Sequence, residues 1–341
     1  MQADDHHEKV EVGDEEKAQR AAPAYVLDQR EKKLKEAQAT RKKQLAEASK
    51  KDREKFSHLL ANKPVQCESF LSNPDVRISP QPFDAINAMG PDDFVIHNGT
   101  RRTGKTWLDR YLLYAQRHFF RCGEVMTNTP MNGFWQHHFP EWKVLKGWCP
   151  GVCEAIMEEQ GRVVELYRRF PDKINPYRVL VLEDCANDLT HDQLLMDLGA
   201  YARHLCLSVH VITQHPQKLP PIVRSNADIV SVLPLHNAAA LECLYKDYLS
   251  TISEERAKEL LTTYAWKKPK ASQALIINVR EGNTLRDKLF AVVAPDPGPF
   301  SIGCQEYWEG KSTLPTPEEI ELWESEAATN EGSDDDHDSK Q

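Results

Sequence analysis

Short apolar runs alternate with amphipathic stretches through the middle of this chain. Residues 177–182 read Tyr-Arg-Val-Leu-Val-Leu and residues 208–213 read Ser-Val-His-Val-Ile-Thr. The first run is apolar on both faces, which is typical of a strand buried in a parallel sheet, and the second is predicted to be another buried strand. Further strands are predicted at residues 93–97, 124–127, 228–233, 274–279 and 289–293, the last two as a hairpin or an edge pair.

Helical periodicity appears between these runs. Apolar residues at positions 107, 108, 111, 112, 115 and 119 recur at helical spacing, so residues 107–120 are predicted to be a helix packed on a sheet. Other helices are predicted at residues 152–160, 191–204, 237–249 and 253–264, and the rest of residues 130–176 reads as loop. This alternation of strand and helix predicts an α/β fold with a mainly parallel central sheet flanked by helices.

The two ends of the chain differ in composition from its middle. Of the 341 residues 40% are hydrophobic, enough for a core, yet the mean hydropathy is −0.60. We expect a packed domain over residues 75–310. Residues 1–24 are expected to be disordered and acidic, residues 25–74 charged and helical, and residues 311–341 an acidic disordered tail. The charged helical segment could be a solvated helix or a basic arm that contacts DNA or another subunit.

Charge and cysteine content bear on the partners and the cellular compartment of the protein. The formal net charge is −9, but residues 316–341 hold ten acidic residues and one lysine, which is −9 by themselves. The remainder is therefore near neutral, and a DNA partner is not excluded. Eight cysteines without a regular framework are typical of reduced thiols, and no signal peptide or membrane span is recognisable. We expect a soluble intracellular protein.

A glycine-rich motif directly follows the predicted strand at residues 93–97. The motif consists of Gly99, Thr100, Arg101, Arg102, Thr103, Gly104, Lys105 and Thr106. Its spacing is that of a phosphate-binding loop, in which backbone N–H groups and a helix N-terminus surround the phosphates. Lys105 is expected to contact the β- and γ-phosphates of ATP, and Thr106 is expected to bind Mg²⁺.

Two acidic residues end the buried strand at residues 177–182. Glu183 and Asp184 are expected at the carboxyl edge of the sheet, where parallel sheets bind ligands. One acid would hold Mg²⁺ and the other would polarise the attacking water. By position Glu183 is the metal acid and Asp184 the base, although the two roles could be exchanged.

Polar residues around the next strand complete the candidate site. Gln214 ends the strand at residues 208–213 and could contact the γ-phosphate and the catalytic water. Arg203 and Arg224 lie on either side of this strand. Each is a candidate for the guanidinium that accelerates hydrolysis in this class, supplied in cis or by a neighbouring subunit. Each could equally be a surface ion-pair residue.

The class of nucleotide-binding protein is narrowed by motifs that the sequence lacks. There is no Asn-Lys-x-Asp motif, which disfavours a GTPase, and no Leu-Ser-Gly-Gly-Gln motif, which disfavours a transporter ATPase. The order of phosphate loop, acid pair and strand ending in glutamine suits RecA-like ring ATPases. The predicted fold is therefore a RecA-like P-loop NTPase.

Residues 199–233, GAYARHLCLSVHVITQHPQKLPPIVRSNADIVSVL, resemble the sensor region of the genome-packaging ATPases of nucleocytoplasmic large DNA viruses, which belong to the FtsK/HerA superfamily. Together with GTRRTGKT and VLVLEDC, the resemblance covers residues 93–295. The sequence departs from the family pattern in having Glu183 where such motors usually have Asp, and Arg101 and Arg102 where many relatives have smaller residues.

The resemblance implies an ATP- and Mg²⁺-dependent motor that moves double-stranded DNA into a virion. It also implies a ring-shaped homo-oligomer with capsid proteins as partners, and a location in the host cytoplasm or the virion. By the same resemblance Gln214 senses the γ-phosphate. Three alternatives remain open: another DNA-translocating or helicase-like ATPase of this superfamily, a nucleotide-dependent assembly scaffold, and a small-molecule kinase, which lacks a recognisable arginine-rich lid.

Overall fold

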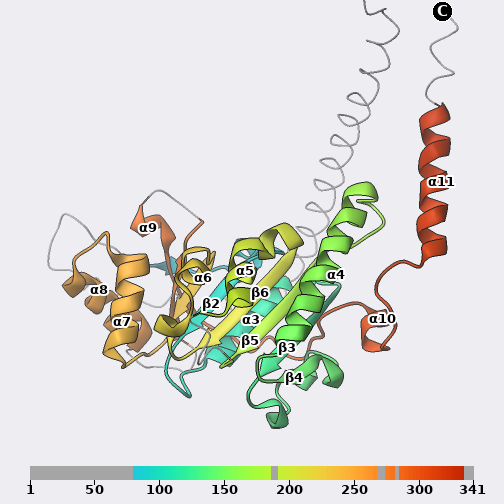
Figure 1. Cartoon of the computed structure of the whole chain (residues 1–341). Helices are drawn as coiled ribbons and strands as arrows, with labels where there is room; N and C mark the ends of the chain where they lie inside the picture. Colours follow the sequence, from blue (N-terminus) through green and yellow to red (C-terminus); the bar gives the residue numbers. More distant parts are fainter. Residues whose placement is uncertain (1–79, 186–190, 267–272, 281–283, 334–341) are drawn as a thin grey trace, which may run out of the picture.

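The computed structural model describes residues 80–185, 191–266, 273–280 and 284–333 (Figure 1). The disordered segment expected at residues 1–24 and the charged helix expected from residue 25 lie outside these ranges. Among the described residues, no helix is both long and apolar enough to cross a membrane.

One mixed sheet forms the centre of the molecule. Its strands are β1 (Gln81–Pro82), β2 (Phe94–Asn98), β3 (Cys122–Thr127), β4 (Val144–Lys146), β5 (Arg178–Glu183), β6 (Leu207–Thr213), β7 (Ile229–Val232), β8 (Gln273–Asn278) and β9 (Leu289–Val293). Their order across the sheet is β1-β9-β8-β7-β2-β6-β5-β3-β4. Pairing is parallel throughout except at β8, which runs antiparallel to both of its neighbours. The mainly parallel α/β fold predicted from the sequence is therefore confirmed.

Helices cover both faces of this sheet. They are α2 (Ala85–Ala88), α3 (Lys105–Gln116), α4 (Pro150–Arg169), α5 (Gln193–Tyr201), α6 (Pro221–Ser225), α7 (Ala238–Leu244), α8 (Glu254–Leu261), α9 (Leu285–Lys288), α10 (Gln305–Trp308) and α11 (Pro317–Ser333). Figure 1 shows α4, α5 and α6 on the near face and α3 behind the sheet. Short 3₁₀ turns and two π turns join or extend these elements.

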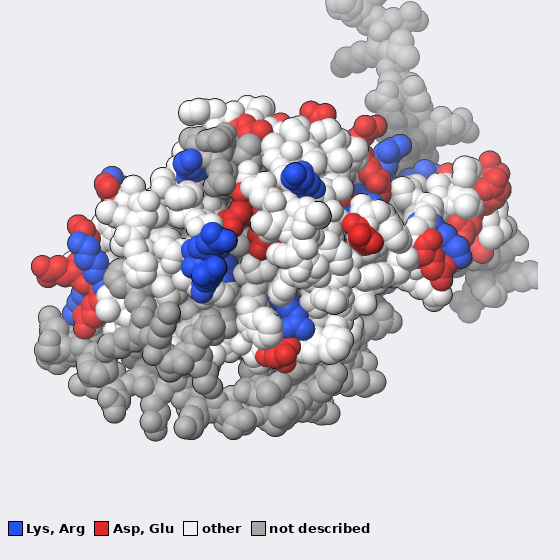
Figure 2. All heavy atoms as spheres, turned by 90° about the horizontal axis from the view of Figure 1, so that it is seen from below, with Lys and Arg blue, Asp and Glu red and all other residues white. Residues whose placement is uncertain are grey.

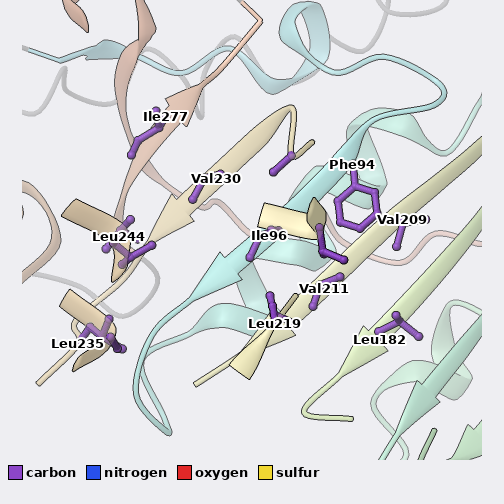
Figure 3. Close-up of a cluster of buried hydrophobic side chains, with 14 of the residues drawn as sticks. Phe94, Ile96, Leu182, Val209, Val211, Leu219, Val230, Leu235, Leu244 and Ile277 are labelled. Carbon is purple, nitrogen blue, oxygen red and sulfur yellow. The ribbon is translucent and has the colours of Figure 1, made fainter. Parts of the chain in front are cut away.

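The alternation of side chains along the strands explains the two layers. Phe94 and Ile96 of β2 point to the core beneath α4, α5 and α6, whereas Val95 between them packs with α3. Figure 3 shows the first of these cores, in which residues of β2 meet Val209 and Val211 of β6. Because successive strand residues face opposite sides, runs that are apolar at every position become buried on both.

Helix α4 is longer than the sequence predicted. It was expected at residues 152–160 and extends over Pro150–Arg169. Gly161 lies one residue beyond the predicted end, and glycine weakens helices. However, Val163 and Tyr167 continue its buried face, so tertiary packing outweighs the cost of the glycine.

The disorder expected for residues 311–341 is corrected for part of that segment, because Pro317–Ser333 form helix α11. Thr316 and the third residue of the helix exchange hydrogen bonds between side chain and backbone, which caps the first turn. Trp323 then packs against Phe170 at the end of α4, with ring centroids 5.5 Å apart. Local capping and this aromatic contact stabilise a helix that acidic composition alone did not suggest.

An ion-pair network lies at the amino edge of the central strands. Asp93, which precedes β2, is 1% exposed and pairs with Arg280. Arg280 also approaches Asp228, the residue before β7, and Arg203 pairs with Asp228. Burial raises the pKa of Asp93 to about 6, although Arg280 opposes the shift. The folded protein therefore binds more protons than the unfolded chain between about pH 4 and 6, and this group's contribution to stability decreases as pH rises through that range.

We expect Arg280→Met to destabilise the protein by about 3–5 kcal/mol at pH 8, because it leaves a buried carboxylate without a counter-charge. The loss should be smaller at pH 5, where Asp93 can protonate. Urea unfolding at both pH values measures it. Lys258→Met is the control, since its ammonium forms only an exposed pair with Glu254. An equal loss at both pH values would contradict the expectation.

Candidate functional site

The glycine-rich motif lies at the carboxyl edge of the sheet, between β2 and the first residue of α3. Gly104 has φ of 96° and Arg102 has φ of 64°, so the loop turns through two left-handed residues. A Cβ atom at Gly99 would lie 2.7 Å from Thr103 Oγ1 and 2.9 Å from Leu233 Cβ, so a side chain does not fit there. Glycine is thus required at the entry of the loop for close packing and at its end for conformation.

Lys105 opens helix α3 and points back over the loop. Its Nζ donates a hydrogen bond to the Thr100 carbonyl at 3.1 Å, and the residue is 6% exposed. Burial lowers the pKa of Lys105, while Asp184 and Glu183 act to raise it. The ammonium therefore lies near both acids of the predicted pair, at the end of a helix whose N–H groups face the same space.

Glu183 is held by three donors at the end of β5. Its Oε1 accepts a hydrogen bond from the Thr106 hydroxyl at 2.5 Å. Its Oε2 accepts from Thr127 Oγ1 at 2.9 Å and from the Trp135 indole Nε1 at 2.8 Å. Thr127 is the parallel partner of Glu183 across β3 and β5. The structure thus brings together Thr106 and Glu183, which the sequence predicted as magnesium ligands.

Thr127 and Trp135 were not predicted as site residues. Thr127 ends a predicted strand at residues 124–127, and its position beside Glu183 follows only once the order of the strands is known. Trp135 lies in a 3₁₀ turn after β3, and its ring is fully buried. The sequence around it reads as loop, so no periodic pattern indicated that this tryptophan would be buried at the site.

Asp184 adopts an unusual backbone conformation immediately after β5. Its φ is 50°, in the left-handed region that Asp tolerates better than most residues. Its N–H donates to the Ile212 carbonyl at 2.8 Å, which fixes this turn against β6. The Gln214 side-chain amide donates to Asp184 Oδ2 at 3.2 Å. Gln214 therefore lies against the acid pair, as expected of a residue that ends the neighbouring strand.

Each of the two arginine candidates is paired with an aspartate outside the glycine loop. Arg203 pairs with Asp228, whose N–H donates to the carbonyl of Phe94 at the start of β2. The glycine loop follows the end of that five-residue strand, so the two lie about 15 Å apart along it. Arg224 pairs with Asp247 at 2.6 Å. In contrast, Arg101 and Arg102 are exposed on the loop itself.

We expect Trp135→Phe to reduce ATP turnover several-fold, because Glu183 loses one of its three donors while the aromatic ring is retained. The change should also lower stability by about 1–3 kcal/mol through the lost hydrogen bond and the small cavity. Turnover at saturating ATP and thermal unfolding measure the two effects. Trp142→Phe is the control, since that ring is 55% exposed. Unchanged turnover in Trp135→Phe would show that the indole does not position Glu183.

Comparison with known proteins identifies viral relatives. The chain is 25% identical over 232 residues to "Uncharacterized protein L437" of Acanthamoeba polyphaga mimivirus, covering 66% of this chain and 80% of that protein. It is 26% identical over 245 residues to "Uncharacterized protein 075L" of Invertebrate iridescent virus 6, covering 67% and 92%. No family model matches.

Among solved structures, the chain is similar to the genome packaging NTPase B204 from Sulfolobus turreted icosahedral virus 2 in complex with ATP-gammaS. The TM-score is 0.40 and the identity 18%, over 60% of this chain and 98% of that chain. It is similar, with a TM-score of 0.40 and 14% identity, to the cytoplasmic domain of the type VII secretion ATPase EccC of Thermomonospora curvata, covering 60% of this chain and 25% of that one.

Proposed function

We propose that this protein is a Mg²⁺-dependent ATPase of the RecA-like class that moves double-stranded viral DNA into the virion. The observation that carries the ATPase is the contact between the Thr106 hydroxyl and Glu183, with Lys105 beside it, at the carboxyl edge of a parallel sheet. The motor role rests on the resemblance of residues 199–233 to packaging ATPases and is supported by the viral origin of the sequence relatives.

The oxygen donors at the end of β5 suit Mg²⁺, which prefers hydroxyl, carboxylate and water oxygens. Thr106 and Glu183 would hold this ion, which supplies charge neutralisation at the phosphates. The loop N–H groups and Lys105 would bind the phosphates themselves. Asp184 would accept the proton of the attacking water, and Gln214, hydrogen-bonded to Asp184, would orient that water and sense the γ-phosphate.

In such motors an arginine near the γ-phosphate accelerates hydrolysis by stabilising the charge of the transition state. Arg203 lies at the opposite edge of the sheet from its own loop, so we propose that any action of Arg203 is in a neighbouring subunit of a homo-oligomeric ring. Arg224 is held by Asp247 and the Leu219 carbonyl and would have to leave these partners to act. The proposed location is the host cytoplasm and the virion, with capsid proteins as further partners.

Basic side chains are the expected contacts for the phosphates of DNA. On the face seen in Figure 2, Lys and Arg side chains of the described residues form separate groups among neutral and acidic ones, without a continuous basic patch.

The test measures ATP hydrolysis by the wild type with and without long double-stranded DNA, at several salt concentrations. We expect DNA to stimulate hydrolysis, and the stimulation to decrease as salt rises, because phosphate contacts release counterions. Hydrolysis without DNA stimulation would favour a nucleotide-dependent scaffold, and phosphate transfer to a small acceptor would favour a kinase. Stimulation without packaging activity would favour another DNA-translocating ATPase of the FtsK/HerA type.

A further inference from the structure

Three side chains with titratable groups are buried together beneath the glycine loop, outside the contacts described above. They are His97 on β2, Asp109 on α3 and His210 on β6, and all three are 0% exposed. Their donor atoms lie within 4.8 Å of one another. Ionisable side chains buried in an otherwise apolar interior are tolerated only when each is hydrogen-bonded or ion-paired.

A single carboxylate oxygen joins the two imidazoles. Asp109 Oδ1 is 2.9 Å from His97 Nε2 and is also hydrogen-bonded to His210 Nδ1. The outer ring nitrogens also have partners. His97 Nδ1 is 2.7 Å from Ser231 Oγ on β7, and His210 Nε2 is 2.9 Å from Gln116 Oε1 on α3.

The partner of Gln116 determines where the protons lie. Gln116 Nε2 donates to the Gly90 carbonyl at 2.6 Å, so its Oε1 must accept and His210 Nε2 must carry a hydrogen. A second hydrogen lies between His210 Nδ1 and Asp109 Oδ1. His210 is therefore hydrogen-bonded through both ring nitrogens, to Gln116 and to Asp109.

His97 can satisfy both of its contacts as a neutral ring. It donates from Nε2 to Asp109 and accepts at Nδ1 from the Ser231 hydroxyl. Burial lowers the pKa of His97 even though Asp109 opposes the shift, which agrees with a neutral ring. Burial would raise the pKa of Asp109, but His210 and His97 outweigh it and lower that pKa, which agrees with an ionised carboxylate.

The same three residues could in principle hold a metal ion. Ligands of a tetrahedral zinc site bond the metal at about 2.0 Å, which places neighbouring ligand atoms about 3.3 Å apart. Here both imidazole nitrogens are closer than this to Asp109 Oδ1, at hydrogen-bond separation. Protons rather than a metal ion therefore account for the geometry.

The placement of the triad in the chain connects it to the nucleotide site. His97 lies two residues before Gly99, Asp109 lies about one helical turn after Lys105, and His210 lies four residues before Gln214. The strands that carry the two histidines are adjacent and parallel. The triad thus ties together the three elements that hold the loop, the lysine and the glutamine.

We propose that His97, Asp109 and His210 are positioning residues of the ATPase, which hold helix α3 and strand β6 in fixed relation so that the loop and Gln214 remain aligned. This inference rests on the proposed ATPase function. All three side chains are 0% exposed, so we assign them a positioning role and not a catalytic one. They act through the backbone segments that they join, and the shared carboxylate oxygen makes that arrangement sensitive to the loss of either partner.

The first test is Asp109→Asn, which keeps the size of the side chain and removes its charge. We expect kcat for ATP to fall about 10- to 100-fold, because small displacements of reacting groups are costly. The affinity for a non-hydrolysable ATP analogue should change less than about threefold, since Lys105 and Thr106 remain. The double variant Asp109→Asn/His210→Gln should fall no further, because the two residues act as one unit.

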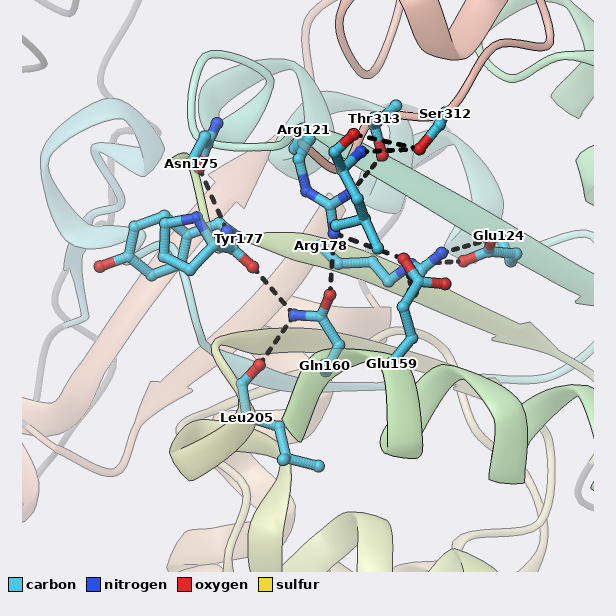
Figure 4. Close-up of polar contacts among 12 residues, drawn as sticks. Arg121, Glu124, Glu159, Gln160, Asn175, Tyr177, Arg178, Leu205, Ser312 and Thr313 are labelled. Carbon is cyan, nitrogen blue, oxygen red and sulfur yellow. Dashed lines mark hydrogen bonds and ion pairs between the residues drawn. The ribbon is translucent and has the colours of Figure 1, made fainter. Parts of the chain in front are cut away.

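The control is Glu124→Gln, which breaks another buried ion pair of the same sheet. Glu124 is 2% exposed and pairs with Arg178 at 3.1 Å (Figure 4). We expect it to lower Tm without changing kcat. If Asp109→Asn also lowers only Tm and leaves kcat unchanged, the triad is structural and the inference is overturned.

A second measurement does not depend on activity or on the folding of a variant. In wild-type protein labelled with ¹⁵N-histidine, we expect ring N–H signals of His97 and His210 that exchange slowly with solvent, because both rings are 0% exposed and hydrogen-bonded. Rapid exchange of these ring protons, or a stoichiometric metal ion bound by these histidines, would overturn the inference. Wild-type protein that binds no ATP would instead refute the proposed function and, with it, the positioning role, even where the proton assignment holds.

Discussion

Lys105→Ala is expected to abolish ATP binding and hydrolysis. The ammonium is nearly buried at the start of α3, whereas Arg101 and Arg102 of the same motif are exposed on the loop. We expect hydrolysis to fall at least about 100-fold, because the charge also stabilises the transition state. Binding of a fluorescent ATP analogue and release of phosphate measure the two losses.

Lys246→Ala is the matched control for this substitution. Its ammonium forms an exposed pair with Glu242 at 2.7 Å, on the helical segment after α7. We expect binding and hydrolysis to remain at the wild-type level in this variant. Full activity of Lys105→Ala would refute the assignment of the loop as the ATP site.

The second large effect is expected from the acid pair. Glu183→Gln should retain nucleotide binding but require a much higher Mg²⁺ concentration, because it weakens the ligand opposite Thr106. Asp184→Asn should retain both nucleotide and Mg²⁺ affinity and lose about 10²- to 10⁴-fold in kcat, the usual contribution of a general base. Titration of Mg²⁺ at saturating ATP separates the two variants.

The contacts of each residue explain why different effects are expected. Glu183 bonds Thr106 directly, whereas Asp184 turns away from β5 and meets Gln214. If Asp184→Asn raises the Mg²⁺ requirement and Glu183→Gln does not, Asp184 is the metal ligand and Glu183 is the general base. Asp287→Asn is a surface control, since its carboxylate only caps the short helix α9.

Much of the fold could be predicted because the central strands β5, β6 and β7 are rich in Val, Ile and Leu. β5 and β6 begin and end within one residue of the predicted runs. The short strand β4 could not be predicted, since its three residues are held by pairing with β3 rather than by their own pattern. Helix α11 was missed because its contact with Phe170 joins segments more than 150 residues apart.

The candidate site was predicted in part, for a similar reason. Thr106 could be predicted from the spacing of the phosphate-loop motif, and Glu183 from its position at the end of a buried strand. The structure places the two residues in contact. Trp135 reaches Glu183 from 48 residues away, which depends on how the segment after β3 folds back. Arg203 lies close to Gln214 in sequence, but β6 separates them and puts them at opposite edges of the sheet.

The two outer strands also limit how copies of this chain can associate. At one edge β1 has two residues and includes Pro82, which has no N–H to donate. At the other edge β4 has three residues and ends at the exposed Lys146. Short strands with proline or lysine are poor templates for strand addition. The proposed ring would therefore form through side-chain contacts between helices and loops of the described residues, which could separate and re-form during a cycle without disturbing the sheet.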